Sequence, residues 1–143
     1  MNNDTVSLLK KCNAGIKMGV NSIDDVLPYV KDGNMKGALN ACKDEHATLG
    51  DKTHKLLVQN GGETKDPHPV ARAMSEMKTR SRIMFDRTDA SIADIMTDGC
   101  NMGIKSLHKY INKYENASAE SKEMANRLIE IEERLVTTLT DYL

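Results

Sequence analysis

The sequence predicts an all-α protein, and three observations carry that prediction. Aromatic residues make up only 3% of the 143 residues, with one Phe and no Trp, whereas Met occurs 9 times. Runs of β-branched residues alternating with polar ones, which are typical of strands, are missing. Apolar residues recur instead at spacings of three and four, which is the period of a helix. Four such stripes follow one another along the chain and predict a four-helix bundle.

The first predicted helix spans about 4–31 and the second about 34–60, with the turn Asp32-Gly33-Asn34 between them. Pro28 is expected to bend the last turn of the first helix. The apolar stripe of the first helix contains Leu9, Ile16, Val20, Ile23, Leu27 and Val30. The stripe of the second helix contains Met35, Leu39, Cys42, His46, Leu49, Thr53 and Leu56. One histidine, His46, therefore lies on a mostly apolar seam.

The third predicted helix spans about 89–115 and the fourth about 118–143. Thr88 or Asp89 caps the third helix and Ser118 caps the fourth, since short oxygen-bearing side chains bond the first free amides of a helix. The stripe of the third helix contains Ile92, Met96, Cys100, Gly103, Leu107, Tyr110, Ile111 and Tyr114. The stripe of the fourth contains Met124, Leu128, Ile131, Leu135, Leu139 and Tyr142.

The lengths of the connections predict the topology. Tight turns join the first helix to the second and the third to the fourth, so both pairs are antiparallel neighbours. About 27 residues connect the second and third helices, and they include a further predicted amphipathic helix at about 69–86. A connection of that length can cross the whole bundle and start the third helix parallel to the second. The expected topology is up-down-down-up in a single domain, residues 1–143.

Two stretches of the sequence carry a resemblance to a known family. One runs from Glu45-His46 to Gly61-Gly62, and the other is Cys-x-x-Gly-x-x-x-Leu-x-x-Tyr, which ends at Tyr110. Together with the long crossover, they resemble an uncharacterised bacterial family of ferritin-like four-helix proteins. The resemblance covers most of the chain. It implies a ferritin-like bundle that descends from metal-binding ancestors.

The ligands of a di-iron centre do not match this sequence. Ferritin-like di-iron proteins take a Glu from each of two helices and Glu-x-x-His from each of the other two. The chain contains no Glu-x-x-His, and the closest approach, Asp51-x-x-His54, places Asp51 on the solvent side of its helix. The inner stripe of the first helix carries no carboxylate. Ferroxidase or di-iron oxidase chemistry is therefore not expected.

A smaller metal site is the alternative that the sequence leaves open. Cys42 and His46 are spaced i, i+4 on one face, and helix counting puts Cys100 and Glu132 near the same depth. A thiolate, imidazole and carboxylate set of this kind suits zinc, or iron. In the competing interpretation the cysteines are small core residues and His46 bonds a neighbour such as Asn13 or Thr53.

Glycines interrupt the predicted helices at Gly19, Gly50, Gly99 and Gly103, where Ala is favoured by nearly 1 kcal/mol. Three explanations remain open. The helices approach one another closely, a small cavity occupies the depth of a former metal centre, or Gly99 marks a break in the third helix.

The surface charges suggest a partner. Positive residues gather on the crossover segment, whereas the last helix is acidic, and such asymmetry favours self-association or an acidic partner. The predicted basic patch consists of Arg72, Lys78, Arg80, Arg82 and Arg87. In the competing interpretation, the basic patch is an ordinary charged helix face that is exposed to solvent and binds no partner. The patch has no interleaved aromatic residues, so nucleic acid is not an expected partner.

The remaining sequence features predict a cytoplasmic protein. Lys10 and Lys11 interrupt any apolar stretch near the N-terminus, and no run approaches the roughly 18 apolar residues of a membrane span. The three cysteines form no short-spaced pair, which is typical of a protein whose thiols are reduced. With a net charge of −1, the chain has no overall positive potential that would attract it to nucleic acid or to an anionic membrane. We therefore expect no enzyme and no cofactor, but a binding, scaffolding or interaction module that forms homodimers or binds a protein partner.

Overall fold

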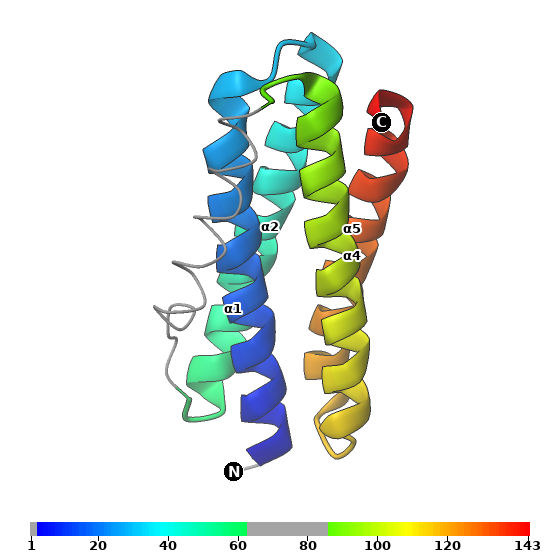
Figure 1. The fold of residues 1–143 in the computed structure, drawn as a ribbon. Helices are drawn as coiled ribbons and strands as arrows, with labels where there is room; N and C mark the ends of the chain where they lie inside the picture. The colour runs from blue at the N-terminus through cyan, green and yellow to red at the C-terminus, as the bar shows by residue number, and fades with distance from the viewer. Residues whose placement is uncertain (1–2, 63–85) are drawn as a thin grey trace.

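The computed structural model describes residues 3–62 and 86–143 of the chain. All regular elements in these ranges are helical: α1 (Asn3–Val26), α2 (Gly33–Gln59), α4 (Asp89–Lys113) and α5 (Ala119–Leu139), with short 3-10 turns at Leu27–Tyr29 and Thr140–Tyr142. The four long helices form a bundle (Figure 1). The all-α four-helix prediction is confirmed. The predicted crossover helix, about 69–86, lies outside the described residues except for its last position.

Side-chain caps set the starts of three helices. Asp32 accepts a hydrogen bond from the Met35 amide at 2.8 Å, Thr88 from the Ser91 amide at 3.2 Å and Ser118 from the Ser121 amide at 3.1 Å. Each bond satisfies an amide that has no partner within its own helix. Thr88, rather than Asp89, is thus the cap of α4.

The first helix ends earlier than the predicted position 31. Its α-helical part stops at Val26, and the chain continues as the 3-10 turn Leu27–Tyr29. The reason is Pro28, which lacks an amide hydrogen and disfavours helical backbone at the residue before it. At its far end, α2 stops where Gly61 takes a φ of 77°, a left-handed conformation that favours glycine.

The helix α4 runs without a break through Gly99, so the proposed break at that residue is wrong. A Cβ atom added at Gly99 meets nothing within 4 Å, so close packing does not explain this glycine either. By contrast, a Cβ atom added at Gly19 would contact His46, and one added at Gly103 would contact Glu132.

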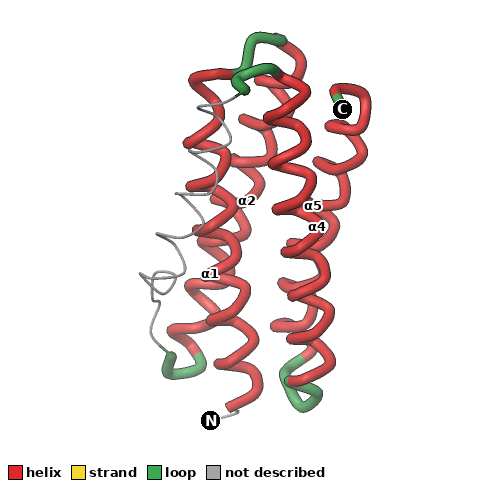
Figure 2. The backbone as a smooth tube through the Cα atoms, viewed as in Figure 1, coloured by secondary structure: helices red, strands yellow, loops and turns green. Residues whose placement is uncertain are grey.

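Hydrogen bonds at both ends of the bundle define the directions of the helices (Figure 2). The Asp89 carboxylate, at the start of α4, accepts bonds from the Lys31 and Asp32 amides in the α1–α2 connection. At the other end, the Asn116 amide donates to Asp4 at the start of α1. Both α2 and α4 therefore run antiparallel to α1 and parallel to each other, and the chain leaves α2 and enters α4 at opposite ends.

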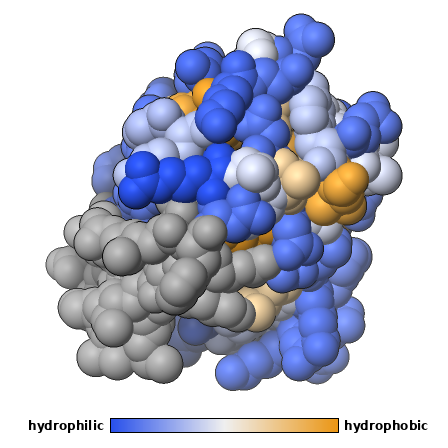
Figure 3. Space-filling model, turned by 45° about the horizontal axis from the view of Figure 1, so that its top comes forward, coloured by the Kyte–Doolittle hydropathy of each residue, from blue (hydrophilic) through white to orange (hydrophobic). Residues whose placement is uncertain are grey.

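The core lies along the axis of this bundle. Its fully buried side chains include Leu8, Leu39, Ile92 and Leu128, one from each long helix. Most of the coloured surface in Figure 3, which belongs to the described residues, is hydrophilic, as the amphipathic stripes require.

Candidate functional site in the bundle interior

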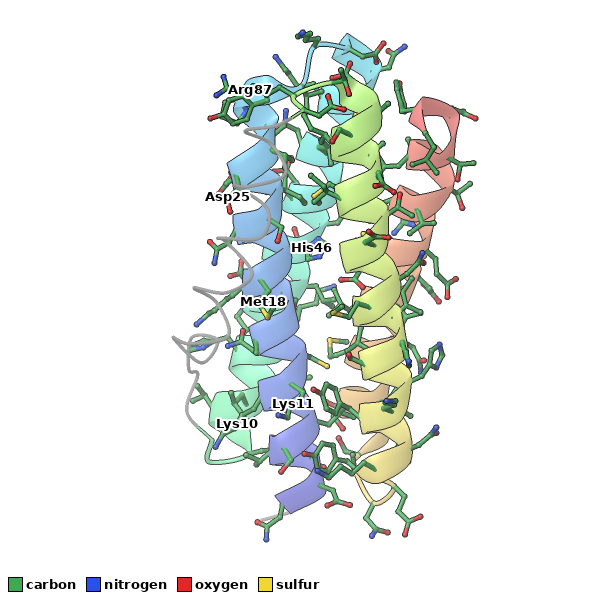
Figure 4. All side chains as sticks on the ribbon, in the orientation of Figure 1. Lys10, Lys11, Met18, Asp25, His46 and Arg87 are labelled. Atoms are coloured by element: carbon green, nitrogen blue, oxygen red, sulfur yellow. The ribbon has the colours of Figure 1, made fainter. Side chains whose placement is uncertain are left out.

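All four residues predicted as metal ligands lie in the interior. Cys42 and His46 come from α2, Cys100 from α4 and Glu132 from α5, and their exposed fractions are 4%, 2%, 7% and 8%. Figure 4 shows His46 among the helices rather than on the outside. A histidine and a carboxylate at this depth need a physical explanation, because burying polar groups is unfavourable unless they find partners.

The ring of His46 is held from one side only. Its Nδ1 lies 2.8 Å from the Cys42 carbonyl oxygen, so Nδ1–H donates to the backbone of its own helix, and the Cys42 Sγ lies 3.5 Å from the same nitrogen. The expected partners Asn13 and Thr53 are not used: the Thr53 hydroxyl donates to the Gly50 carbonyl. Because Nδ1 carries the proton, Nε2 presents a lone pair to the interior. Burial lowers the pKa of His46, which keeps the ring neutral.

Glu132 is the second unusual group. In the described part of the chain, its Oε2 and the Nε2 of His46 are among the buried side-chain atoms that lack a hydrogen-bond partner. Burial raises the pKa of Glu132 to about 8, so near neutral pH the carboxyl group holds its proton.

His46 and Glu132 lie at the same depth on neighbouring helices. Glu45 of α2 forms an ion pair with Arg134 of α5 at 2.5 Å, which shows that these positions of the two helices stand opposite each other. His46 directly follows Glu45, and Glu132 precedes Arg134 by less than one helical turn. A lone pair and a carboxyl group therefore enter one interior layer from α2 and α5.

Two glycines make room for these side chains. A Cβ atom at Gly19 of α1 would lie 2.7 Å from the His46 Nε2, and one at Gly103 of α4 would lie 2.5 Å from the Glu132 Oε2. Both distances are shorter than van der Waals contact, so any larger residue forces the neighbour to move. Of the explanations for the glycines, close approach is the one that the structure bears out at these two positions.

The two glycines belong to a repeated pattern that the sequence reasoning missed. Gly15–Gly19 and Gly99–Gly103 share the sequence Gly-x-x-Met-Gly. In each hairpin, the last glycine of the pattern on the first helix packs against a titratable residue of the second, His46 in one case and Glu132 in the other. The repeat was visible in the sequence, whereas the pairing needed the structure.

The thiols of Cys42 and Cys100 lie near Glu132. Burial raises the pKa of Cys42 to about 12, and the charges of Glu45 and Glu132 add to this shift. Burial, followed by the charges of Glu132 and Cys42, raises the pKa of Cys100. Both thiols are therefore protonated and act as small apolar groups in this state. Across the described residues, no three His, Cys, Asp or Glu side chains stand grouped as a metal site.

The predicted basic surface cannot be placed as a whole. Four of its residues lie outside the described ranges: Arg72, Lys78, Arg80 and Arg82. Arg87 is exposed, and its guanidinium carbon lies 4.9 Å from the centre of the Tyr29 ring. A cation at this distance from an aromatic face is attracted to it, so Arg87 belongs to the end of the bundle where α1 finishes.

Comparison of the chain with models of protein families, with curated proteins and with solved structures finds no match in any of the three. Among the described residues, no helix is long and apolar enough to cross a membrane.

Proposed function

We propose that this chain is a non-catalytic, ferritin-like binding module that holds a single zinc or iron ion in the bundle interior, at the layer of His46 and Glu132. The observation that carries the proposal is the pair of buried donor atoms without partners, His46 Nε2 and Glu132 Oε2, at one depth. A bound cation gives both atoms a partner, and it offsets the cost of ionising the buried Glu132 to a carboxylate.

The orientation of His46 supports the same function. Histidine ligands of metals commonly donate their other ring N–H to a backbone carbonyl or a carboxylate, which fixes the tautomer and the direction of the free lone pair. The bond from His46 Nδ1 to the Cys42 carbonyl has this form.

The donor set fits the proposed ions. Zinc accepts imidazole, carboxylate and thiolate ligands, and the charge of ionised Glu132 raises the pKa of both the Cys42 and Cys100 thiols, so the carboxylate lies near both. Because the side chains do not stand grouped as a site, loading requires the thiols to rotate and lose their protons. The bound ion would supply a positive charge that replaces the protons of these groups.

The topology supports the ferritin-like part of the proposal. Two antiparallel hairpins with α2 parallel to α4, joined by one long connection, are the arrangement of ferritin-like bundles, in which metal sites lie between facing helices. The sequence Gly-x-x-Met-Gly occurs in the first helix of each hairpin, in α1 and in α4, so it relates one hairpin to the other, as the topology does.

Elemental analysis of protein purified without a histidine tag and loaded with Zn²⁺ or Fe²⁺ tests the proposal. We expect about one ion per chain in the wild type and loss of at least tenfold in affinity in His46→Gln and in Glu132→Gln. The matched control is His54→Gln, an exposed histidine on the same helix, which leaves binding unchanged. No stoichiometric zinc or iron, or equal binding by wild type and His46→Gln, contradicts the proposal.

A further inference from the structure

The donor atoms of the interior layer are out of direct reach of solvent. His46 and Glu132 are both buried, and each lies against the backbone of a neighbouring helix. An ion that binds them must pass between two helices, because side chains fill the interior of a protein about as densely as an organic crystal. The wall of the bundle must therefore open at some seam between helices.

Gly19 of α1 and Gly103 of α4 stand at nearly the same depth on neighbouring helices. These helices lie side by side and run antiparallel (Figures 1 and 2). The Lys11 ammonium lies 5.1 Å from the centre of the Tyr110 ring, so these two positions stand close together. Gly19 is eight residues beyond Lys11 and Gly103 is seven residues before Tyr110, so both lie about 10–12 Å along the bundle from that contact. The two glycines therefore meet the same part of the α1–α4 seam.

Each of these glycines separates one donor atom from the outside. Gly19 lies against the His46 Nε2 and Gly103 against the Glu132 Oε2. Both glycines are partly exposed, whereas the side chains behind them are buried. With no side chain at either position, the backbone alone covers each donor. Glycine is the residue that permits such close approach between a backbone and a ligand.

The surface outside the two glycines is open, and its side chains are flexible. Met18 and Met102 directly precede the glycines and are 38% and 66% exposed. Gly99, one turn before Gly103, leaves open space, since a Cβ there meets nothing within 4 Å. Methionine is unbranched and has three rotatable bonds, so its side chain moves aside readily. Figure 4 shows Met18 on α1, with His46 deeper in the bundle.

Ion pairs bridge two of the other seams near this layer. Asp24 of α1 pairs with Lys43 of α2 at 2.5 Å, and Glu45 of α2 pairs with Arg134 of α5. Lys43 and Glu45 lie within one turn of His46. A cation that entered at either seam would have to separate Lys43 or Arg134 from its partner and would be repelled by that positive charge.

We propose that a zinc or iron ion reaches the interior layer through the α1–α4 seam, at a port formed by Gly19 and Gly103 and covered by Met18 and Met102. The inference rests on the proposed function, because a port has a role only where the interior binds an ion. An ion that passes between the glycines meets His46 Nε2 behind one and Glu132 Oε2 behind the other. The port also explains why Gly-x-x-Met-Gly occurs once in each of the two helices that form this seam.

A removable plug at the port tests the proposal. Met102→Cys introduces an exposed thiol, which benzyl methanethiosulfonate converts into a mixed disulfide that a reductant removes. The native cysteines are buried, and mass spectrometry checks that each chain carries one label. Stopped-flow mixing with Zn²⁺ measures the association rate, and mixing of the loaded protein with a chelator measures the dissociation rate.

We expect the label to slow association and dissociation by the same factor, about tenfold or more, because a plug in the route raises the barrier in both directions. The bound state is not altered, so the dissociation constant should stay within about twofold of that of wild type treated with the same reagent. Removal of the label, followed by removal of the reductant, should restore both rates. Met18→Cys with the same label should slow both rates from the other helix of the port.

The matched control is Val58→Cys with the same label. Val58 is 56% exposed, but it lies near the end of α2, away from the port. Circular dichroism checks that every labelled variant is helical. Unchanged association in both port variants, or equal slowing by the label at residue 58, overturns the port and leaves the interior site intact. Absence of Zn²⁺ binding in unlabelled wild type overturns the proposed function and the port together.

Discussion

The imidazole of His46 lies directly against Gly19, with its Nε2 atom 2.7 Å from the place where a Cβ at residue 19 would stand. No side chain larger than hydrogen fits there unless the ring moves, although alanine is the better helix former. The glycine therefore makes room for a buried polar ring, and the substitution of residue 19 probes how tightly this layer is packed.

Gly19→Ala should lower the free energy of unfolding by about 1–3 kcal/mol, because the overlap with the ring exceeds the gain in helix propensity. Urea unfolding followed by circular dichroism measures the change. The control is Gly99→Ala on α4, where the added methyl meets nothing and should raise stability by up to about 1 kcal/mol. Equal effects of the two substitutions would show that the contact with His46 does not constrain residue 19.

The buried carboxyl of Glu132 should make the metal-free protein less stable as pH rises. Its pKa is raised from 4.5 to about 8, so its contribution is fully present below about pH 4.5 and is lost as pH rises toward 8. Glu132→Gln cannot ionise, and relative to wild type it should gain about 1–3 kcal/mol between pH 5 and pH 8. Chemical unfolding at both pH values, with chelator present, measures this difference.

Between pH 5 and about pH 6.5, the ionisation of His46 changes the free energy of unfolding in the opposite direction to that of Glu132. Burial lowers its pKa below 6.5, so its contribution is present above pH 6.5 and is lost as pH falls below that value. The comparison of Glu132→Gln with wild type at each pH removes this common effect. A difference that stays constant between pH 5 and pH 8 would mean that Glu132 ionises freely in the folded protein.

Asp89 ties the start of α4 to the α1–α2 connection, and its removal should loosen that end of the bundle. Its two carboxylate oxygens accept bonds from the Lys31 and Asp32 amides at 2.8 and 2.9 Å. Asp89→Ala leaves both amides without this acceptor, and we expect a loss of about 1–2 kcal/mol. Hydrogen exchange should show faster exchange at residues 31 and 32. The exposed Asp51→Ala on α2 serves as the control, and unchanged exchange at both amides in Asp89→Ala would contradict the role of the carboxylate.

Much of the interior set could be predicted from periodicity. Cys42, His46 and Cys100 fall on the inner stripes of their helices, and all three are buried. Glu132, which helix counting puts near the depth of Cys42 and His46, is also buried. Helix starts at Ser118 and at Thr88 or Asp89 were visible as cap residues, since capping depends on only three or four neighbouring residues.

Other features could not be predicted in this way. The partner of His46 Nδ1 is the Cys42 carbonyl rather than Asn13 or Thr53, because the choice depends on the rotamer that the packed helices allow. The continuity of α4 through Gly99 was also open, since intrinsic propensity is weak and packing of the rest of the helix outweighs it. Whether the interior binds an ion remains a prediction.

The sequence by itself determined the helices, their inward stripes and most of their ends, because these follow from local backbone geometry and from a period of 3.6 residues. The tertiary structure decided that Gly19 meets His46, that Gly103 meets Glu132 and that both pairs share one layer. These relationships depend on the register between helices far apart in sequence, and side-chain packing across the bundle sets that register.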